Sequence, residues 1–176
     1  RTRRATDHAL EVSNVYPGMF LAEPGKSEYT VIADWDTQLP GGSENETFMA
    51  FSGPVFRGDT VAFVGLGNVN TMGIYKWSRS TGELDVVADQ HTAVPDSEYN
   101  FGDFPERPSV WTDGSVVFFA EGPGDTTGVY LSNADGELST LVDMATEIEG
   151  EKPIYLGNAN DAFNGTTCTF YAVMES

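Results

Sequence analysis

An internal repeat of about 55 residues is the feature of this sequence that most constrains its fold. A short apolar run followed by Asp-x-x-Thr recurs at intervals of 55 and then 54 residues, and the copies begin at Val31, Val86 and Thr140. A second element, Gly73-Ile74-Tyr75, recurs in step at Gly128-Val129-Tyr130. Several elements that recur in one order at one period indicate a chain built from copies of one supersecondary unit.

Each copy of the repeat predicts four short β-strands joined by tight turns. In the first complete copy we expect strands near 54–56, 61–64, 73–77 and 84–88, because these runs are rich in β-branched and aromatic residues. Glycine and asparagine mark the turns between the first two strands, since they tolerate positive φ; the turns are Gly58-Asp59, Asp113-Gly114 and Asn164-Gly165. No helical periodicity is evident, and residues 147–151 could form one short helical turn at most.

Four-stranded units that recur at roughly 40–50 residues are typical of β-propeller blades, so this repeat implies blades with longer loops. The matching segments are Val61-Ala62-Phe63, Gly73-Ile74-Tyr75, Val31–Asp34 through Leu39-Pro40, and Val86–Asp89 through Val94-Pro95. With these segments the chain resembles secreted bacterial β-propeller repeat proteins, whose blades follow the pattern V-A-F, G-(I/V)-Y and V-A-D-x-x-T-x-(I/L/V)-P. The resemblance implies an all-β fold of blades and carries no activity with it.

The predicted blades do not add up to a closed ring. We expect an N-terminal extension over 1–16 and a repeat domain over 17–176; the domain divides into a half blade (17–34), two blades (50–89 and 104–143) and a second half blade (152–173). That makes about three blades, whereas closed propellers have about four to eight. Two copies could form a six-bladed ring, the chain could belong to a longer propeller, or the sheets could form another small sandwich. Because open strand edges are templates for association, the first interpretation predicts a second copy or a protein partner.

The repeated Asp-x-x-Thr motif is the most prominent candidate site. Its aspartates follow the fourth strand of each copy, so a ring of carboxylates at one end of a propeller could bind a cation or a polar ligand. The competing interpretation is a local Asx or Ser/Thr turn, in which the aspartate accepts backbone N–H groups. Recurrence in every copy favours the turn. The three pairs are Asp34/Thr37, Asp89/Thr92 and Asp143/Thr146.

Calcium is the one cofactor that the sequence suggests. Asn158, Asn160 and Asp161 place closely spaced oxygens in one loop, and Asp34 and Asp36 do so in another. Hard cations prefer several oxygen ligands, but neither segment matches the twelve-residue calcium loop. A solvated polar turn is the simpler interpretation of both segments.

Two further residues of the loops after the fourth strands are candidates for ligand contact. Trp35 lies between two carboxylates and could stack on a sugar in a carbohydrate-binding module, or cover the end of a blade. His91 takes the place of Asp36 in the repeat and, with nearby carboxylates, could act as a general base in a propeller hydrolase or lyase. A surface histidine is the more common case. Tyr75 and Tyr130 occupy the same place in two copies, so we expect them in the core.

Composition narrows the possible partners and the compartment. Nine basic residues against 27 acidic ones give a net charge of −18, which excludes binding to a nucleic-acid backbone and disfavours an anionic membrane surface. No apolar run approaches the roughly 20 residues of a transmembrane helix. The single cysteine, Cys168, excludes an intrachain disulfide and is expected to be a small buried side chain. The family resemblance points to an extracellular, periplasmic or organelle-lumen location, where the sequons at Asn45 and Asn164 would matter only in a eukaryote.

The sequence thus predicts an all-β chain of propeller-type blades that acts as a non-catalytic binding or scaffolding module. We expect the interaction face to be formed by the loops after the fourth strands, near 34–50, 89–104 and 143–152. These loops are acidic, so a partner would be basic, or a cation would bridge.

Overall fold

The computed structural model describes the backbone of residues 2–4 and 17–175, and side chains within 17–157 and 162–175. These residues form thirteen strands and no helix, as the sequence predicts. The strands are β1 (Thr2–Arg4), β2 (Gly18–Ala22), β3 (Glu28–Asp34), β4 (Phe48–Arg57), β5 (Thr60–Gly67), β6 (Met72–Ser78), β7 (Leu84–Asp89), β8 (Ser109–Val110), β9 (Val116–Ala120), β10 (Gly128–Ser132), β11 (Leu138–Asp143), β12 (Pro153–Phe163) and β13 (Cys168–Met174). Residues 1 and 5–16 of the predicted N-terminal extension lie outside the described part.

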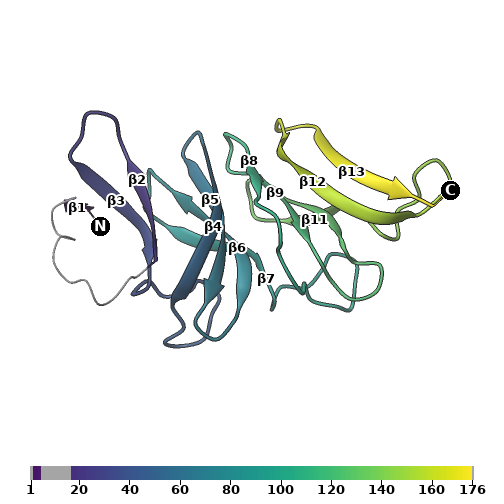
Figure 1. Ribbon diagram of the computed structural model, residues 1–176, viewed down its shortest axis with the longest axis horizontal. Helices are drawn as coiled ribbons and strands as arrows, with labels where there is room; N and C mark the ends of the chain where they lie inside the picture. Colours follow the sequence, from purple (N-terminus) through teal and green to yellow (C-terminus); the bar gives the residue numbers. More distant parts are fainter. Residues whose placement is uncertain (1, 5–16, 176) are drawn as a thin grey trace.

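The strands form four small antiparallel sheets, none of which closes on itself. The second and third sheets are four-stranded meanders, β4-β5-β6-β7 and β8-β9-β10-β11, and they span residues 48–89 and 109–143. The first sheet has the order β1-β3-β2, and the fourth contains only β12 and β13. The sheets follow one another in a row, with the two termini at opposite ends (Figure 1).

The predicted tight turns are present, and glycine explains them. Gly58, Gly114 and Gly165 have φ values of 61°, 88° and 92°, which L side chains rarely adopt. The segment 147–151 is a turn rather than a helical turn. Ile148 and Glu151 exchange both backbone hydrogen bonds at 2.8 and 3.1 Å, and Glu149 and Gly150 between them have positive φ, as in a two-residue hairpin turn.

A cluster of four aromatic rings lies in the second sheet. A similar cluster lies at the third sheet, where Phe101 and Phe104 come from the loop before β8. Phe48 meets Tyr75 edge-on with ring centroids 5.0 Å apart, and Phe101 meets Tyr130 in the same way at 4.8 Å. Two further phenylalanines complete each cluster. The first cluster consists of Phe48, Phe51, Phe63 and Tyr75, and the second consists of Phe101, Phe104, Phe118 and Tyr130. Both tyrosines are fully buried, as predicted.

The last two strands along the chain of the first, second and third sheets share one irregularity. A register shift, of the kind a β-bulge produces, lies between Met19 and Phe20 in the first sheet. The same shift lies between Ile74 and Tyr75 in the second sheet, and between Val129 and Tyr130 in the third. The bulges therefore identify Phe20, Tyr75 and Tyr130 as structural counterparts, each 55 positions after the one before.

The grooves between adjacent sheets also correspond. The groove between the first and second sheets has a volume of about 550 Å³, and that between the second and third about 400 Å³. Every residue lining the second groove lies 55 positions after one lining the first; the pairs are Leu21/Lys76, Thr30/Asp85, Val31/Val86, Ile32/Val87, Trp77/Ser132, Arg79/Ala134, Ser80/Asp135 and Thr81/Gly136. The third sheet thus packs on the second in the way that the second packs on the first.

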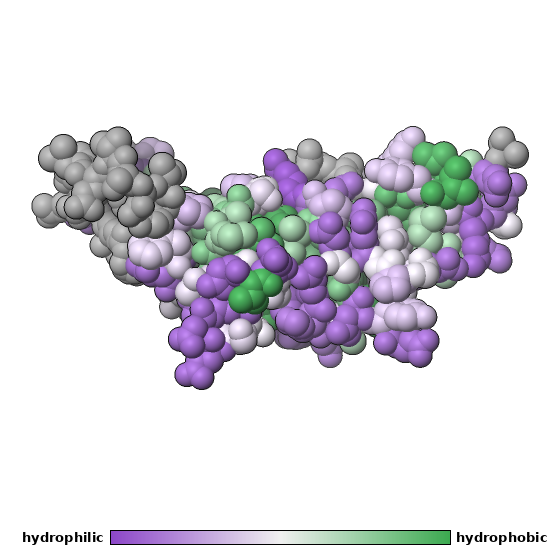
Figure 2. Space-filling model, turned by 60° about the horizontal axis from the view of Figure 1, so that its bottom comes forward, coloured by the Kyte–Doolittle hydropathy of each residue, from purple (hydrophilic) through white to green (hydrophobic). Residues whose placement is uncertain are grey.

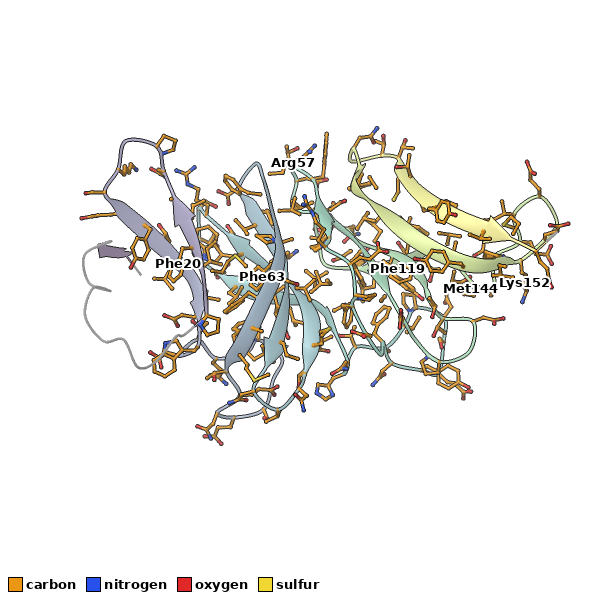
Figure 3. All side chains as sticks on the ribbon, in the orientation of Figure 1. Phe20, Arg57, Phe63, Phe119, Met144 and Lys152 are labelled. Atoms are coloured by element: carbon orange, nitrogen blue, oxygen red, sulfur yellow. The ribbon has the colours of Figure 1, made fainter. Side chains whose placement is uncertain are left out.

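Trp111 connects turns from neighbouring sheets. The guanidinium carbon of Arg57, at the end of β4, lies 5.1 Å from the Trp111 ring centroid and sits between the second and third sheets (Figure 3). From the other side, the β12–β13 turn approaches so closely that a Cβ at Gly165 would lie 2.3 Å from Trp111 Nε1. Sheets two, three and four therefore meet at one side chain.

Candidate functional site

The three Asp-x-x-Thr motifs form the same closed turn. The threonine hydroxyl donates to the aspartate Oδ1 at 2.8 Å in Asp34/Thr37, 2.8 Å in Asp89/Thr92 and 2.7 Å in Asp143/Thr146. The aspartate backbone N–H donates to the threonine Oγ1 at 2.9, 3.0 and 3.1 Å in the same order. A backbone bond from the threonine N–H to the aspartate carbonyl completes each turn.

These contacts give the motif a structural role. The Oδ1 atoms of Asp89 and Asp143 also accept the backbone N–H of the second residue after them, at 2.9 and 3.1 Å. Asp34 and Asp89 are each 3% exposed, and Asp143 is half-buried. An oxygen that already accepts two hydrogen bonds inside a turn has little capacity for a ligand. The geometry is that of the predicted Asx and Ser/Thr turn.

The other candidates from these loops are exposed. Trp35 is 41% exposed, and Asp36 and His91 are also at the surface. Among the described residues, no three His, Cys, Asp or Glu side chains are placed to hold a metal ion together. The predicted calcium ligands Asn158, Asn160 and Asp161 lie outside the described side chains, so calcium stays a prediction.

A buried polar cluster that the sequence did not indicate includes Glu46 of the first of these loops and Tyr75 of β6. Glu46 is only 2% exposed; its Oε2 accepts the backbone N–H of Ser43 at 3.1 Å, while its Oε1 has no hydrogen-bond partner among the described residues. The buried Tyr75 hydroxyl likewise has none. Burial, followed by the charges of Asp89 and Glu46, raises the pKa of Tyr75 well above its usual range.

The sequence contained no local pattern that marks Glu46, and its special position becomes visible only when two units of the structure are compared. In the corresponding loop of the next unit, Val94 N–H bonds the Tyr99 carbonyl, just as Leu39 N–H bonds that of Glu46. Tyr99 is exposed where Glu46 is buried. The loop from Val94 to Tyr99 is also two residues shorter than that from Leu39 to Glu46, so the two units differ locally at this place.

Cys168 is half-buried rather than fully buried. Burial raises the pKa of its thiol, which reduces the fraction of reactive thiolate. Of the two sequon asparagines, Asn45 is exposed, at φ 73°. The Asn164 Oδ1 accepts bonds from Thr166 and Thr167, so its side chain is engaged in the turn.

Exposed carboxylates remain the main chemical feature of the three loops. Within 34–50, 89–104 and 143–152 there are twelve acidic residues and one lysine. Eight of the acidic side chains are exposed: Asp36, Glu44, Asp96, Glu98, Asp103, Glu147, Glu149 and Glu151. The aspartates of the turns hold the loops, while these eight set the charge that a partner would meet.

The described structure defines an all-β protein of small antiparallel sheets with acidic connecting loops. No helix in the described residues is long and apolar enough to cross a membrane, in agreement with the sequence. The chain matches the model of the family of unknown function DUF7453 over residues 5–154, and it therefore belongs to that family. No curated protein and no solved structure matches it.

Proposed function

We propose that this chain is a non-catalytic binding or scaffolding module of β-propeller type, whose acidic loops dock a basic partner. The propeller-type arrangement is supported by the matching grooves, because a constant relation between successive sheets is what a ring of blades requires. A rigid row of sheets that presents loops is a common platform for binding.

The single observation that carries the binding proposal is that the loop carboxylates fall into two groups, those bonded inside the turns and those exposed at the surface. The turn aspartates are used internally, as in Asp89/Thr92, whereas the eight surface carboxylates surround the turns with almost no compensating lysine or arginine. Like charges gathered on ordered loops raise the local potential and steer an oppositely charged partner.

The experiment compares two variants of equal net charge. The loop variant carries Glu98→Gln, Glu147→Gln and Glu149→Gln; the control carries Glu83→Gln, Asp85→Asn and Asp135→Asn, which are exposed positions outside these loops. A labelled dodecalysine peptide serves as the basic probe, with binding followed by fluorescence anisotropy.

We expect the loop variant to bind the probe about tenfold more weakly and the control to stay within about twofold, since exposed ion pairs contribute roughly 0.2–1 kcal/mol each. Equal weakening in the two variants would show that only net charge matters, and would refute a docking face formed by the loops.

A further inference from the structure

Among the described residues, two strand edges at opposite ends of the row of sheets lack the neighbouring strand that their counterparts have. In both complete sheets the second strand, β5 or β9, lies between the first and third strands. The fourth sheet contains β12 and β13 alone, so β13 has the place of a second strand without a third beside it. In the first sheet β2 is an edge strand, and its bulge identifies it as a third strand.

The counterpart of Phe170 follows from the turn at the start of β13. Arg57 pairs with Thr60 across a two-residue turn, and Asn164 bonds Thr167 across the equivalent turn, so the corresponding positions lie 107 apart. Phe170 is therefore the counterpart of Phe63. Phe118 has this place in the third sheet, because β9 and β10 repeat the pairing of β5 and β6 at a distance of 55.

Exposure of these aromatic residues differs sharply between complete and incomplete sheets. Phe63 and Phe118 are 0% exposed, whereas Phe170 is 41% exposed. Tyr75 and Tyr130 are 0% exposed, whereas their counterpart Phe20 is 44% exposed; Figure 3 shows Phe63 within the row of sheets and Phe20 on the first sheet. Tyr171, beside Phe170, is 60% exposed.

Both edge strands also lack the charges that usually protect an edge. Neither Gly18–Ala22 nor Cys168–Met174 contains a charged residue, although 36 of the 176 residues are charged. Natural edge strands commonly carry lysine or an inward-pointing charge that prevents pairing with another chain. At the β12–β13 end of the row, hydrophobic residues lie at the surface (Figure 2). Ile154 of β12 is 57% exposed.

We propose that β13 of one copy pairs antiparallel with β2 of a second copy, and that two copies thereby close one ring. Phe63 lies opposite Tyr75, and Val61 opposite Trp77. Transferred to the new seam, this register places Phe170 opposite Phe20 and Cys168 opposite Ala22 of the second copy. In each composite sheet β12, β13, β2 and β3 then follow one another in the order found in the two complete sheets, and β1 adds a fifth strand beside β3.

A second copy is the occupant that fits, because each copy carries both halves of the missing sheet. The two edges lie at opposite ends of the row (Figure 1), so a single copy cannot join them itself. A twofold axis makes the two seams identical and leaves neither edge open. Burial of Phe20, Phe170 and Tyr171 would remove roughly 300 Å² of surface from water at each seam. This figure assumes that each ring, already partly buried, gains about half of the 150–250 Å² that an aromatic residue buries in full.

Cross-linking tests the register directly. Cys168 is the single cysteine and Ala22 is exposed, so Ala22→Cys creates a pair that meets only between copies. Mild oxidation should convert most of the A22C protein into a covalent dimer on a non-reducing gel. The control A22C/C168S should stay at the single-chain mass. A ladder of higher oligomers, or no dimer, would overturn a closed two-copy ring.

The native mass gives an independent readout. Light scattering at micromolar concentration in 0.5 M NaCl should give twice 19.1 kDa for the unmodified chain. Phe170→Asp should give the single-chain mass with an unchanged far-ultraviolet spectrum, because Phe170 is already exposed. Tyr99→Asp, at an aromatic residue exposed to a similar extent in a loop, should remain a dimer. A single-chain mass for the unmodified protein would refute the proposal.

This inference rests on the propeller-type arrangement proposed above, but the two can fail separately. An unmodified chain of single-chain mass that still distinguishes the loop variant from its control would overturn the seam and leave the binding face standing. A dimer whose loop variant and control bind dodecalysine equally well would overturn the binding face and leave the seam standing.

Discussion

Two buried tyrosines at corresponding positions should respond in opposite ways to loss of their hydroxyl groups. Tyr75 and Tyr130 are both 0% exposed and take part in matching aromatic clusters. The Tyr130 hydroxyl donates to the Thr126 carbonyl, whereas that of Tyr75 has no partner among the described residues. Tyr→Phe therefore removes a hydrogen-bonded hydroxyl oxygen at position 130 and an unsatisfied one at position 75.

The magnitudes follow from general hydrogen-bond energetics. A buried, unsatisfied hydroxyl costs about 1–3 kcal/mol, so Tyr75→Phe should raise the free energy of unfolding by about 1 kcal/mol after the loss of a few packing contacts. Tyr130→Phe loses a hydrogen bond worth about 0.5–1.5 kcal/mol and should lower it by about 1 kcal/mol. The two variants should thus differ by about 2 kcal/mol.

Urea unfolding followed by tryptophan fluorescence measures both variants against the unmodified chain. A single transition with an unchanged dependence on urea is needed for the comparison, because a changed slope signals a change in the unfolded or folded state. In thermal unfolding the expected difference corresponds to roughly 4–8 °C, at about 2–4 °C per kcal/mol for a chain of this size. If Tyr75→Phe destabilises as much as Tyr130→Phe, the Tyr75 hydroxyl is satisfied in solution and the reasoning fails.

Further predictions concern a turn, a motif and pH. Gly165→Ala should cost several kcal/mol, because strain at φ 92° adds to a clash with Trp111, whereas Gly136→Ala at φ 85° meets nothing within 4 Å and should cost about 1–2 kcal/mol; equal losses would contradict this account of the turn. Asp89→Ala should cost about 2 kcal/mol through two lost hydrogen bonds, and exposed Asp36→Ala less than about 0.5 kcal/mol, both by urea unfolding. Burial raises the pKa of both buried tyrosines above the ordinary 10.0, so the unfolded chain loses those protons first. The contribution of these two tyrosines to the free energy of unfolding should therefore be complete below pH 10 and be lost as the pH rises above it. The double Tyr→Phe variant should lose less stability over the same pH range.

Features of this fold that depend on a few neighbouring residues could be predicted from the sequence. The Asp89-x-x-Thr92 turn is closed by atoms no more than three residues apart, and the turn at Gly58 needs only a residue that tolerates positive φ. The burial of Tyr75 was predictable because its recurrence at Tyr130 exposed a constraint common to both units.

Features that depend on how sheets meet could not be predicted in this way. Glu46 is buried because the loop 39–46 folds back over the second sheet, where a Cβ at Gly67 would lie 2.4 Å from the Glu46 Oε1. No local pattern shows that contact. The segment 147–151 was ambiguous for a similar reason, since two successive residues with positive φ are favoured by the pairing of Ile148 with Glu151 rather than by Glu149 itself.

The net charge of −18 allows the two proposed interactions to be distinguished experimentally, because added salt should strengthen one and weaken the other. Two copies of this chain repel each other at long range, and their seam is formed by uncharged strands, so screening should strengthen the dimer as salt rises from 0.05 to 0.5 M. A basic partner is attracted by the acidic loops, so the same change should weaken its binding. Dimer dissociation constants and dodecalysine affinities measured over one salt series should therefore move in opposite directions. If both weakened with salt, charged contacts would hold the dimer together, and pairing through β2 and β13 would be the wrong account of the seam.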